Sequence, residues 1–134
     1  MGYNEYGLIN NCYTNATVHG RNRVGGLIGF SFHGAFFLCY TEGKVSGIDS
    51  NSENIGGLIG GTNSSRMNFC SSRGVVDGTH DCRYLGGLIG HISATIITSC
   101  YVTGPVIGGH DVGGLVGRTN YSDVITSSYV SGSV

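Results

Sequence analysis

The chain has 134 residues, the size of one domain, and we treat residues 1–134 as a single repeat domain. Only 11% of the residues are charged and the formal net charge is −1, which excludes a strongly basic surface for nucleic acid or an anionic membrane. No apolar run approaches the roughly 18 residues of a membrane-spanning helix. Residues 1–6 lack the basic and apolar parts of a signal peptide.

The first predicted element is a short apolar segment around Cys12-Tyr13. Ile9 lies three residues before the cysteine, and Val18 lies six residues after it. The next element is the hexapeptide VGGLIG, and the two elements then alternate along the chain. The hexapeptide and its variants occupy residues 24–29, 55–60, 85–90 and 112–117, with starts 31, 30 and 27 residues apart. One such unit is too small to bury its own apolar face, so the repeats must stack.

Stacking predicts that equivalent residues form columns, and four of these columns are apolar. The third apolar position of the hexapeptide gives Ile28, Ile59, Ile89 and Val116. The position three residues before the cysteine gives Ile9, Phe36, Met67, Ile97 and Ile125. The cysteine position gives Cys12, Cys39, Cys70 and Cys100, with Ser128 in the last copy. The valine position gives Val18, Val45, Val76, Val106 and Val134.

The composition of these elements is typical of strands and turns. The apolar segments are short and rich in Val, Ile, Tyr and Thr, and no stretch shows helical periodicity. We expect the 25 glycines to let the chain turn sharply through positive φ. The sequence predicts an all-β fold, a parallel β-solenoid of about 4–5 coils with 27–31 residues per coil. Each coil is expected to hold about three short strands, one of them the hexapeptide.

The hexapeptides, the segment Asn11-Cys12-Tyr13 and the triplet at residues 45–47 resemble the GLUG-motif repeats of bacterial surface and secreted proteins. The resemblance covers roughly residues 7–134 and is specific to a repeat family, not to an activity. Such repeats occur in adhesin-like proteins and in the non-catalytic parts of some IgA-cleaving metallopeptidases. The resemblance implies an extracellular or cell-surface location, with any signal peptide outside this chain. It also implies a role as a stalk, spacer or adhesive segment.

Four of the five cysteines share one repeat position, and only Cys82 stands apart. Their spacing matches neither a zinc motif nor a compact disulfide framework. We interpret the four as a column of buried thiols. The alternative is a disulfide between stacked coils, which parallel Cβ directions make difficult. We expect Cys82 to lie in an exposed turn beside Arg83 and to be the most reactive thiol.

The sequence contains no HExxH or GxSxG motif, so we predict neither catalysis nor a cofactor. The pairs His80-Asp81 and His110-Asp111 each begin two residues after a repeat glycine. If they stack on adjacent coils, their four side chains are the candidate metal ligands. The other interpretation is a solvated turn in which aspartate binds backbone amides.

Tyrosine follows the cysteine position in four of the five copies, and Ser71 replaces it in the third. Because neighbouring residues of a strand face opposite sides, an inward cysteine implies an outward tyrosine. The tyrosines of this column are Tyr13, Tyr40, Tyr101 and Tyr129. An exposed aromatic column can bind sugars or a partner, or it can simply pair across the sheet.

Two functions follow from these features. The first is a structural or adhesive module whose partners are copies of itself stacked end to end, or neighbouring repeats of a longer protein. The alternative is a module that binds a glycan or a host protein through the tyrosine column and the loop at residues 48–54. Neither function involves catalysis, nucleic acid or membrane insertion.

Overall fold

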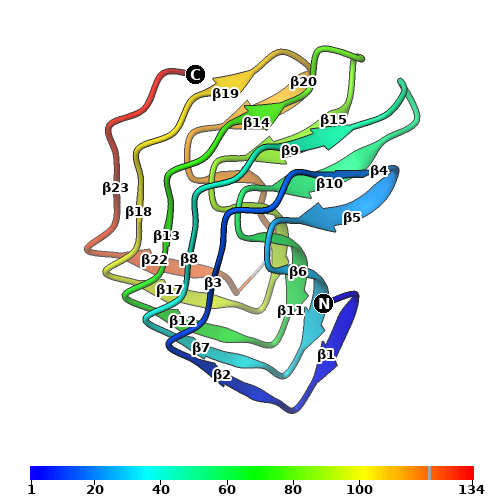
Figure 1. The fold of residues 1–134 in the computed structure, drawn as a ribbon. Helices are drawn as coiled ribbons and strands as arrows, with labels where there is room; N and C mark the ends of the chain where they lie inside the picture. Colours follow the sequence, from blue (N-terminus) through cyan, green and yellow to red (C-terminus); the bar gives the residue numbers. More distant parts are fainter. Residues whose placement is uncertain (121) are drawn as a thin grey trace.

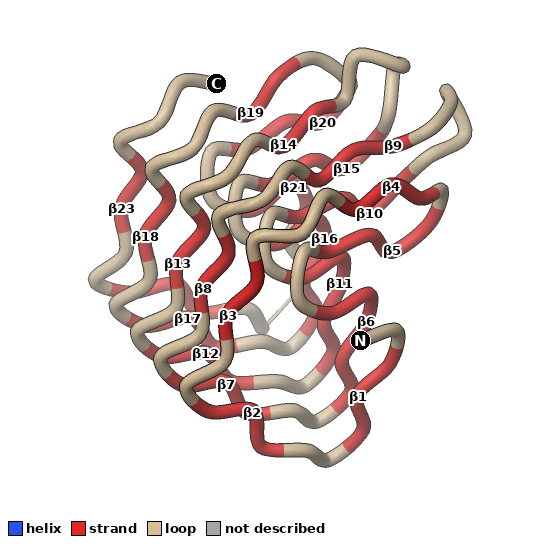
Figure 2. The backbone as a smooth tube through the Cα atoms, in the orientation of Figure 1, coloured by secondary structure: helices blue, strands red, loops and turns tan. Residues whose placement is uncertain are grey.

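The computed structural model describes residues 1–120 and 122–134, and in these ranges the chain forms a parallel β-solenoid without helices. Each strand lies beside its counterparts from the preceding and following coils, as Figures 1 and 2 show. The predicted all-β solenoid is therefore confirmed. No helix of the described residues is long and apolar enough to cross a membrane.

The strands of the described residues form five parallel sheets, numbered in chain order. The first sheet contains β1 (Tyr3–Glu5), β6 (Ile28–Phe32), β11 (Ile59–Asn63), β16 (Ile89–Ser93) and β21 (Val116–Arg118). The second contains β2 (Leu8–Asn10), β7 (Ala35–Phe37), β12 (Arg66–Asn68), β17 (Ile96–Thr98) and β22 (Val124–Thr126). The third contains β3 (Tyr13–Thr14), β8 (Tyr40–Thr41), β13 (Ser71–Ser72), β18 (Tyr101–Val102) and β23 (Tyr129–Val130). The fourth contains β4 (Val18–Gly20), β9 (Val45–Gly47), β14 (Val76–Asp77) and β19 (Val106–Ile107). The fifth contains β5 (Asn22–Gly25), β10 (Glu53–Gly56), β15 (Arg83–Gly86) and β20 (His110–Gly113).

A complete coil thus has five strands, where the sequence predicted about three. The difference arises partly because the hexapeptide is not a single strand. In residues 55–60, Ile55-Gly56 ends β10, Gly57-Leu58 forms a bend, and Ile59-Gly60 begins β11. The other three hexapeptides divide in the same way. Each Gly-Leu pair therefore turns the chain from the fifth sheet into the first sheet of the next coil.

The glycines act differently from the prediction. Among the described glycines only Gly108 and Gly109 have positive φ, whereas other residue types, such as Leu38 with φ of 54°, occupy the left-handed corners. Glycine is required in the hexapeptides because two stretches of backbone approach closely. A Cβ on Gly56 would clash with the carbonyl oxygen of Ile59 and with backbone atoms of the next coil.

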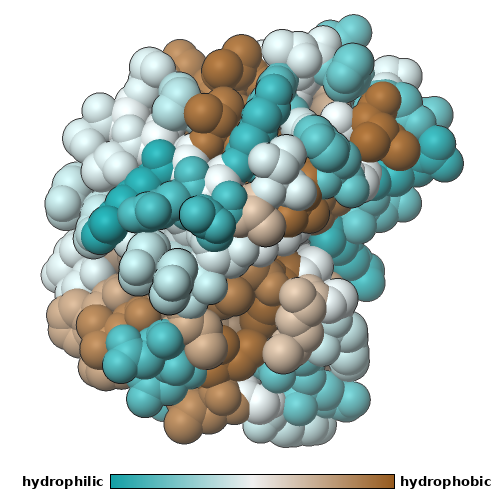
Figure 3. All heavy atoms as spheres, in the orientation of Figure 1, coloured by the Kyte–Doolittle hydropathy of each residue, from teal (hydrophilic) through white to brown (hydrophobic). Residues whose placement is uncertain are grey.

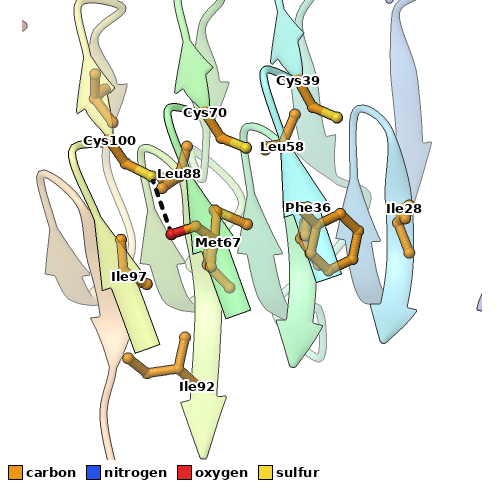
Figure 4. Packing of buried hydrophobic residues seen from close by; sticks show 13 residues of the cluster. Ile28, Phe36, Cys39, Leu58, Met67, Cys70, Leu88, Ile92, Ile97 and Cys100 are labelled. Atoms are coloured by element: carbon orange, nitrogen blue, oxygen red, sulfur yellow. Dashed lines mark hydrogen bonds between the residues drawn. The ribbon is translucent and has the colours of Figure 1, made fainter. Parts of the chain in front are cut away.

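Two clusters of apolar side chains fill the interior. The larger cluster contains Ile28, Phe36, Cys39, Leu58, Ile59, Met67, Cys70, Leu88, Ile89, Ile92, Ile97, Cys100 and Val102, and most of these are drawn in Figure 4. The smaller cluster contains Val24, Val45, Ile55, Val76, Cys82, Leu85 and Val106. Strand pairing is in register through both clusters, so Met67 lies between Phe36 and Ile97, and Val76 lies between Val45 and Val106.

The apolar columns are less buried at the two ends of the solenoid than in its middle. Ile9 and Val18 in the first coil and Val116 in the last are only partly buried. Ile125 is 41% exposed, and Val134, expected to end the valine column, is 67% exposed. Apolar atoms are visible near the centre of the view in Figure 3, which looks onto the side where the first coil lies. Each end therefore presents apolar side chains together with the open edges of the sheets.

All five cysteines are free thiols. Cys39, Cys70 and Cys100 have no exposed surface, and Cys12 in the first coil is partly exposed. Their side chains follow one another along the coil corners, as Figure 4 shows for the three buried residues. In this structure the cysteine column consists of reduced thiols, and the disulfide alternative is not realised.

The expectation of an exposed Cys82 is wrong. Its side chain is fully buried, and the thiol lies 3.6 Å from the carbonyl oxygen of Asp49. Cys82 comes directly before β15. Because neighbouring residues of an extended segment face opposite sides, the exposed Arg83 side chain points outward and the Cys82 side chain points inward. Burial raises the pKa of the Cys82 thiol, which further lowers its reactivity.

Candidate ligand-binding face

The tyrosine column runs along the outer face of the third sheet. Each strand of this sheet is two residues long, and its two side chains point to opposite faces of the sheet. Thr41 and Val102 are buried, whereas Tyr40 and Tyr101 are partly exposed. The backbone therefore fixes the direction of each ring.

Ser71 divides this column into two stacked pairs. It lies in register between Tyr40 and Tyr101. On one side, the ring centres of Tyr13 and Tyr40 are 5.2 Å apart with an angle of 10° between the planes. On the other side, Tyr101 and Tyr129 stack at 5.5 Å, also at 10°. The serine leaves the space of one aromatic ring between the pairs.

The guanidinium of Arg73 partly fills the space left by the missing ring. Its Cζ atom lies 4.9 Å from the centre of the Tyr40 ring and 6.0 Å from that of Tyr101. Arg73 also donates a hydrogen bond of 2.9 Å from Nη2 to the hydroxyl of Tyr101. Two cation–π contacts and one hydrogen bond thus hold a positive charge on the aromatic face.

The contact shifts the pKa values of Arg73 and Tyr101 in opposite directions. The hydrogen bond to Tyr101 raises the pKa of the Arg73 guanidinium, which stays charged at physiological pH. Hydrogen bonds with Ser71 and Arg73 lower the pKa of Tyr101. Arg73 Nη1 also lies 3.4 Å from Oε1 of Glu42, but both side chains are nearly half exposed. An exposed ion pair of this kind contributes little stability and exchanges readily with other anions.

A hollow of about 400 Å³ opens beside Ser71 and Arg73. Tyr40 and Tyr101 line it on the third sheet, and Leu38 and Phe69 line it at the corner toward the second sheet. The corner residues have φ of 54°, and they are 44% and 54% exposed. The remaining lining residues are Asn11, Cys39 and Ser99. The hollow combines aromatic and aliphatic walls, one cation and several hydrogen-bonding groups.

Sequence reasoning identified the four tyrosines but missed Arg73. A signal was present, because Arg73 follows Ser71 by two residues and a strand brings residues so spaced to one face. Phe69 and Leu38 carried no comparable signal. Their exposure depends on the left-handed corner, which ordinary residues rarely adopt.

The four candidate metal ligands are not brought together. His80 and Asp81 lie in an exposed turn, and the strand register pairs His110 with Arg83, three residues beyond His80. The predicted stacking is wrong because this repeat is three residues shorter than the one before, and the shortening falls in that turn. Among the described residues, no group of three or more His, Cys, Asp or Glu side chains could hold a metal ion.

The loop at residues 48–54 lies between the fourth and fifth sheets, away from the tyrosine column. It is closed by its own hydrogen bonds. The Ser52 hydroxyl accepts from the backbone N–H of Ile48 at 3.1 Å, and Asp49 accepts from that of Asn51 at 3.0 Å. Arg21 pairs with Asp49 at 2.7 Å, and residues 53 and 54 belong to β10. The loop and the tyrosine column do not form a common site.

Comparison with protein families finds a match at residues 81–107 to the model of the GLUG motif. The matched segment runs from the turn before β15 to the end of β19. It therefore covers one coil, including the hexapeptide at residues 85–90 and the segment Cys100-Tyr101. No curated protein and no solved structure matches the chain.

Proposed function

We propose that this chain, one coil of which matches the GLUG-motif model, is a structural module: a stalk, spacer or adhesive segment of a surface or secreted bacterial protein. The observation that carries the proposal is the continuous in-register pairing of all five sheets from coil to coil. Hydrogen bonds in all five sheets hold each coil to the coils that precede and follow it. A scaffold needs length and stiffness, and the stacking of hydrogen-bonded coils supports both requirements.

Stretching single molecules held by their two ends tests the scaffold role. Because each coil is held only by its neighbours, we expect the chain to unwind from its ends in discrete steps of about one coil. A coil of 27–31 residues releases a contour length of about 100 Å, at roughly 3.5 Å per residue. Smooth extension at low force, with no steps, would contradict a load-bearing solenoid.

The ends of the solenoid support a further part of the proposal, contact with a second copy or with neighbouring repeats. Among the described residues, the strands of the first and last coils have a partner strand on one side only, and Ile125 and Val130 are exposed in the last coil. Head-to-tail stacking would continue the ladders and bury these side chains, and such a contact yields filaments because it does not close.

Light scattering across a concentration series tests this contact. We expect the particle mass to rise with concentration and the substitution Ile125→Asp to prevent the rise. Ile96→Asp is the matched control, because Ile96 is 39% exposed on a strand that has partners on both sides. A strictly monomeric chain at high concentration would refute stacking between copies, while the scaffold role would stand.

The hollow at Ser71 favours a second function, binding of a glycan or a host protein. It provides aromatic walls and a fixed cation on an outward face, which passive pairing across the sheet does not require. The loop at residues 48–54 gives no comparable support, because its polar groups bind one another.

A further inference from the structure

We infer that the hollow beside Ser71 binds an acidic sugar residue, with the sugar carboxylate on Arg73 and its apolar ring face against the aromatic walls. The inference rests on the binding role proposed above and is independent of the scaffold role. Four features of the site support this ligand class: its charge, its walls, its polar groups and its paired backbone.

The charge of the hollow is positive. Arg73 is the one charged side chain among the described residues that line it, and Glu42, which pairs weakly with Arg73, is not part of the lining. The hydrogen bond to Tyr101 and the two ring contacts hold the guanidinium in place before any ligand arrives. A planar guanidinium held in this way suits a carboxylate, which can accept two parallel hydrogen bonds from it.

The walls and the polar groups fit a sugar ring. Phe69 and Leu38 offer exposed apolar surface at the corner beside the tyrosine column. Asn11 and Ser99 occupy the same corner in the two flanking coils and supply donors and acceptors for sugar hydroxyls. A purely apolar ligand would leave these polar groups and the guanidinium desolvated without partners, which costs free energy.

The backbone of the third sheet disfavours a peptide that binds by strand addition. Peptides that bind along a sheet add a strand to a free edge. The strand at the hollow, β13, pairs with β8 on one side and with β18 on the other, so it has no free edge. Recognition at this position must therefore come from side chains, as it does for sugars.

Nuclear magnetic resonance titration of the ¹⁵N-labelled chain tests the inference with three probes. Methyl glucuronide and methyl glucoside share one ring and differ in the carboxylate, and benzoate carries the carboxylate without the sugar. We expect the glucuronide to shift the amide signals of Ser71, Arg73 and Tyr101. For such an open site we expect a dissociation constant for the glucuronide on the order of 1 mM. The dissociation constants of the other two probes should each be about tenfold larger, as the loss of one strong contact implies.

Three variants locate the site. Arg73→Gln is expected to reduce glucuronide affinity about tenfold, to the level of the glucoside. Arg21→Gln is the matched control, since Arg21 is also an exposed arginine paired with a carboxylate, far from the hollow, and it should leave affinity unchanged. Glu42→Gln removes the competing carboxylate and should strengthen glucuronide binding severalfold, with an effect that added salt reduces.

The outcomes distinguish failure of the acidic-sugar inference from failure of the broader binding role. Equal binding of glucuronide and glucoside at the hollow would overturn the acidic-sugar inference, while a glycan-binding role would stand. If benzoate binds as tightly as the glucuronide, the hollow is an anion site without selectivity for sugars, and the acidic-sugar inference is again overturned. If neither methyl glucuronide nor methyl glucoside shifts any signal of the tyrosine face, the glycan-binding role fails together with the inference.

Discussion

The α-carbon of Gly56 faces the carbonyl oxygen of Ile59 at a distance that leaves no room for a Cβ. The same relation holds between Gly25 and Ile28 and between Gly86 and Ile89. These contacts lie at the bend of each hexapeptide, where one coil ends and the next begins. The repeated glycine is therefore a packing requirement of the coil junction.

Replacing Gly56 by alanine should destabilise the domain by about 3 kcal/mol, because the new Cβ must displace backbone that is fixed by ladders on both sides. Chemical denaturation measures the change in the free energy of unfolding. Gly2→Ala is the control, since no atom lies within 4 Å of a Cβ at that position. Equal stability of the two variants would show that the junction can relax.

Val76→Asp should be still more damaging. Val76 is 1% exposed and stacks between Val45 and Val106, so the carboxylate would be buried without a partner. We expect a loss of about 4 kcal/mol or complete unfolding. Val124→Asp, at a position that is 46% exposed, should change stability by less than about 1 kcal/mol. Thermal melting followed by circular dichroism distinguishes the two results.

Thiol labelling under native conditions, counted by mass spectrometry, should modify Cys12 first. Cys12 is partly exposed, whereas Cys39, Cys70, Cys82 and Cys100 have no exposed surface. The buried thiols should label only when the chain opens, and all five should label in denaturant. Early labelling of Cys82 would mean that the turn at residues 79–81 opens in the native state.

The ion pair between Lys44 and Asp77 predicts a loss of stability in acid. The two side chains are 2.6 Å apart, and the hydrogen bond from Lys44 lowers the pKa of Asp77 from 3.8 to about 2. Because the folded pKa is the lower one, the contribution is complete above about pH 5 and is lost as the pH falls toward 2.

Asp77→Asn should remove this pH dependence and should cost about 1 kcal/mol at neutral pH, since Lys44 is 45% exposed and the pair is screened. The free energy of unfolding measured from pH 7 to pH 2 gives both quantities. Asp81→Asn, in an exposed turn, serves as the control. A wild-type pH profile in Asp77→Asn would assign the acid sensitivity to other carboxyl groups.

The apolar columns were accessible from the sequence because a repeat of near-constant length fixes the register, as for Ile28, Ile59 and Ile89. The number of strands per coil could not be predicted from the sequence, because a strand of two residues such as β13 has no periodicity to detect. The position of His110 depended on where a three-residue shortening falls, and a single sequence does not locate such a gap. The hollow depended on left-handed corners at Leu38 and Phe69, which residue type does not predict.

Amide hydrogen exchange, read residue by residue, tests whether each coil is stabilised by its neighbours. We expect the slowest exchange in the two middle coils, for example at Ile59 and Ile89, whose N–H groups donate to the carbonyl oxygens of Leu88 and Leu115 in the following coil. Exchange should become faster toward the first and last coils, where one side of each sheet is open. Uniform exchange along the chain, or fast exchange at Ile59 and Ile89, would contradict a scaffold held together by stacking.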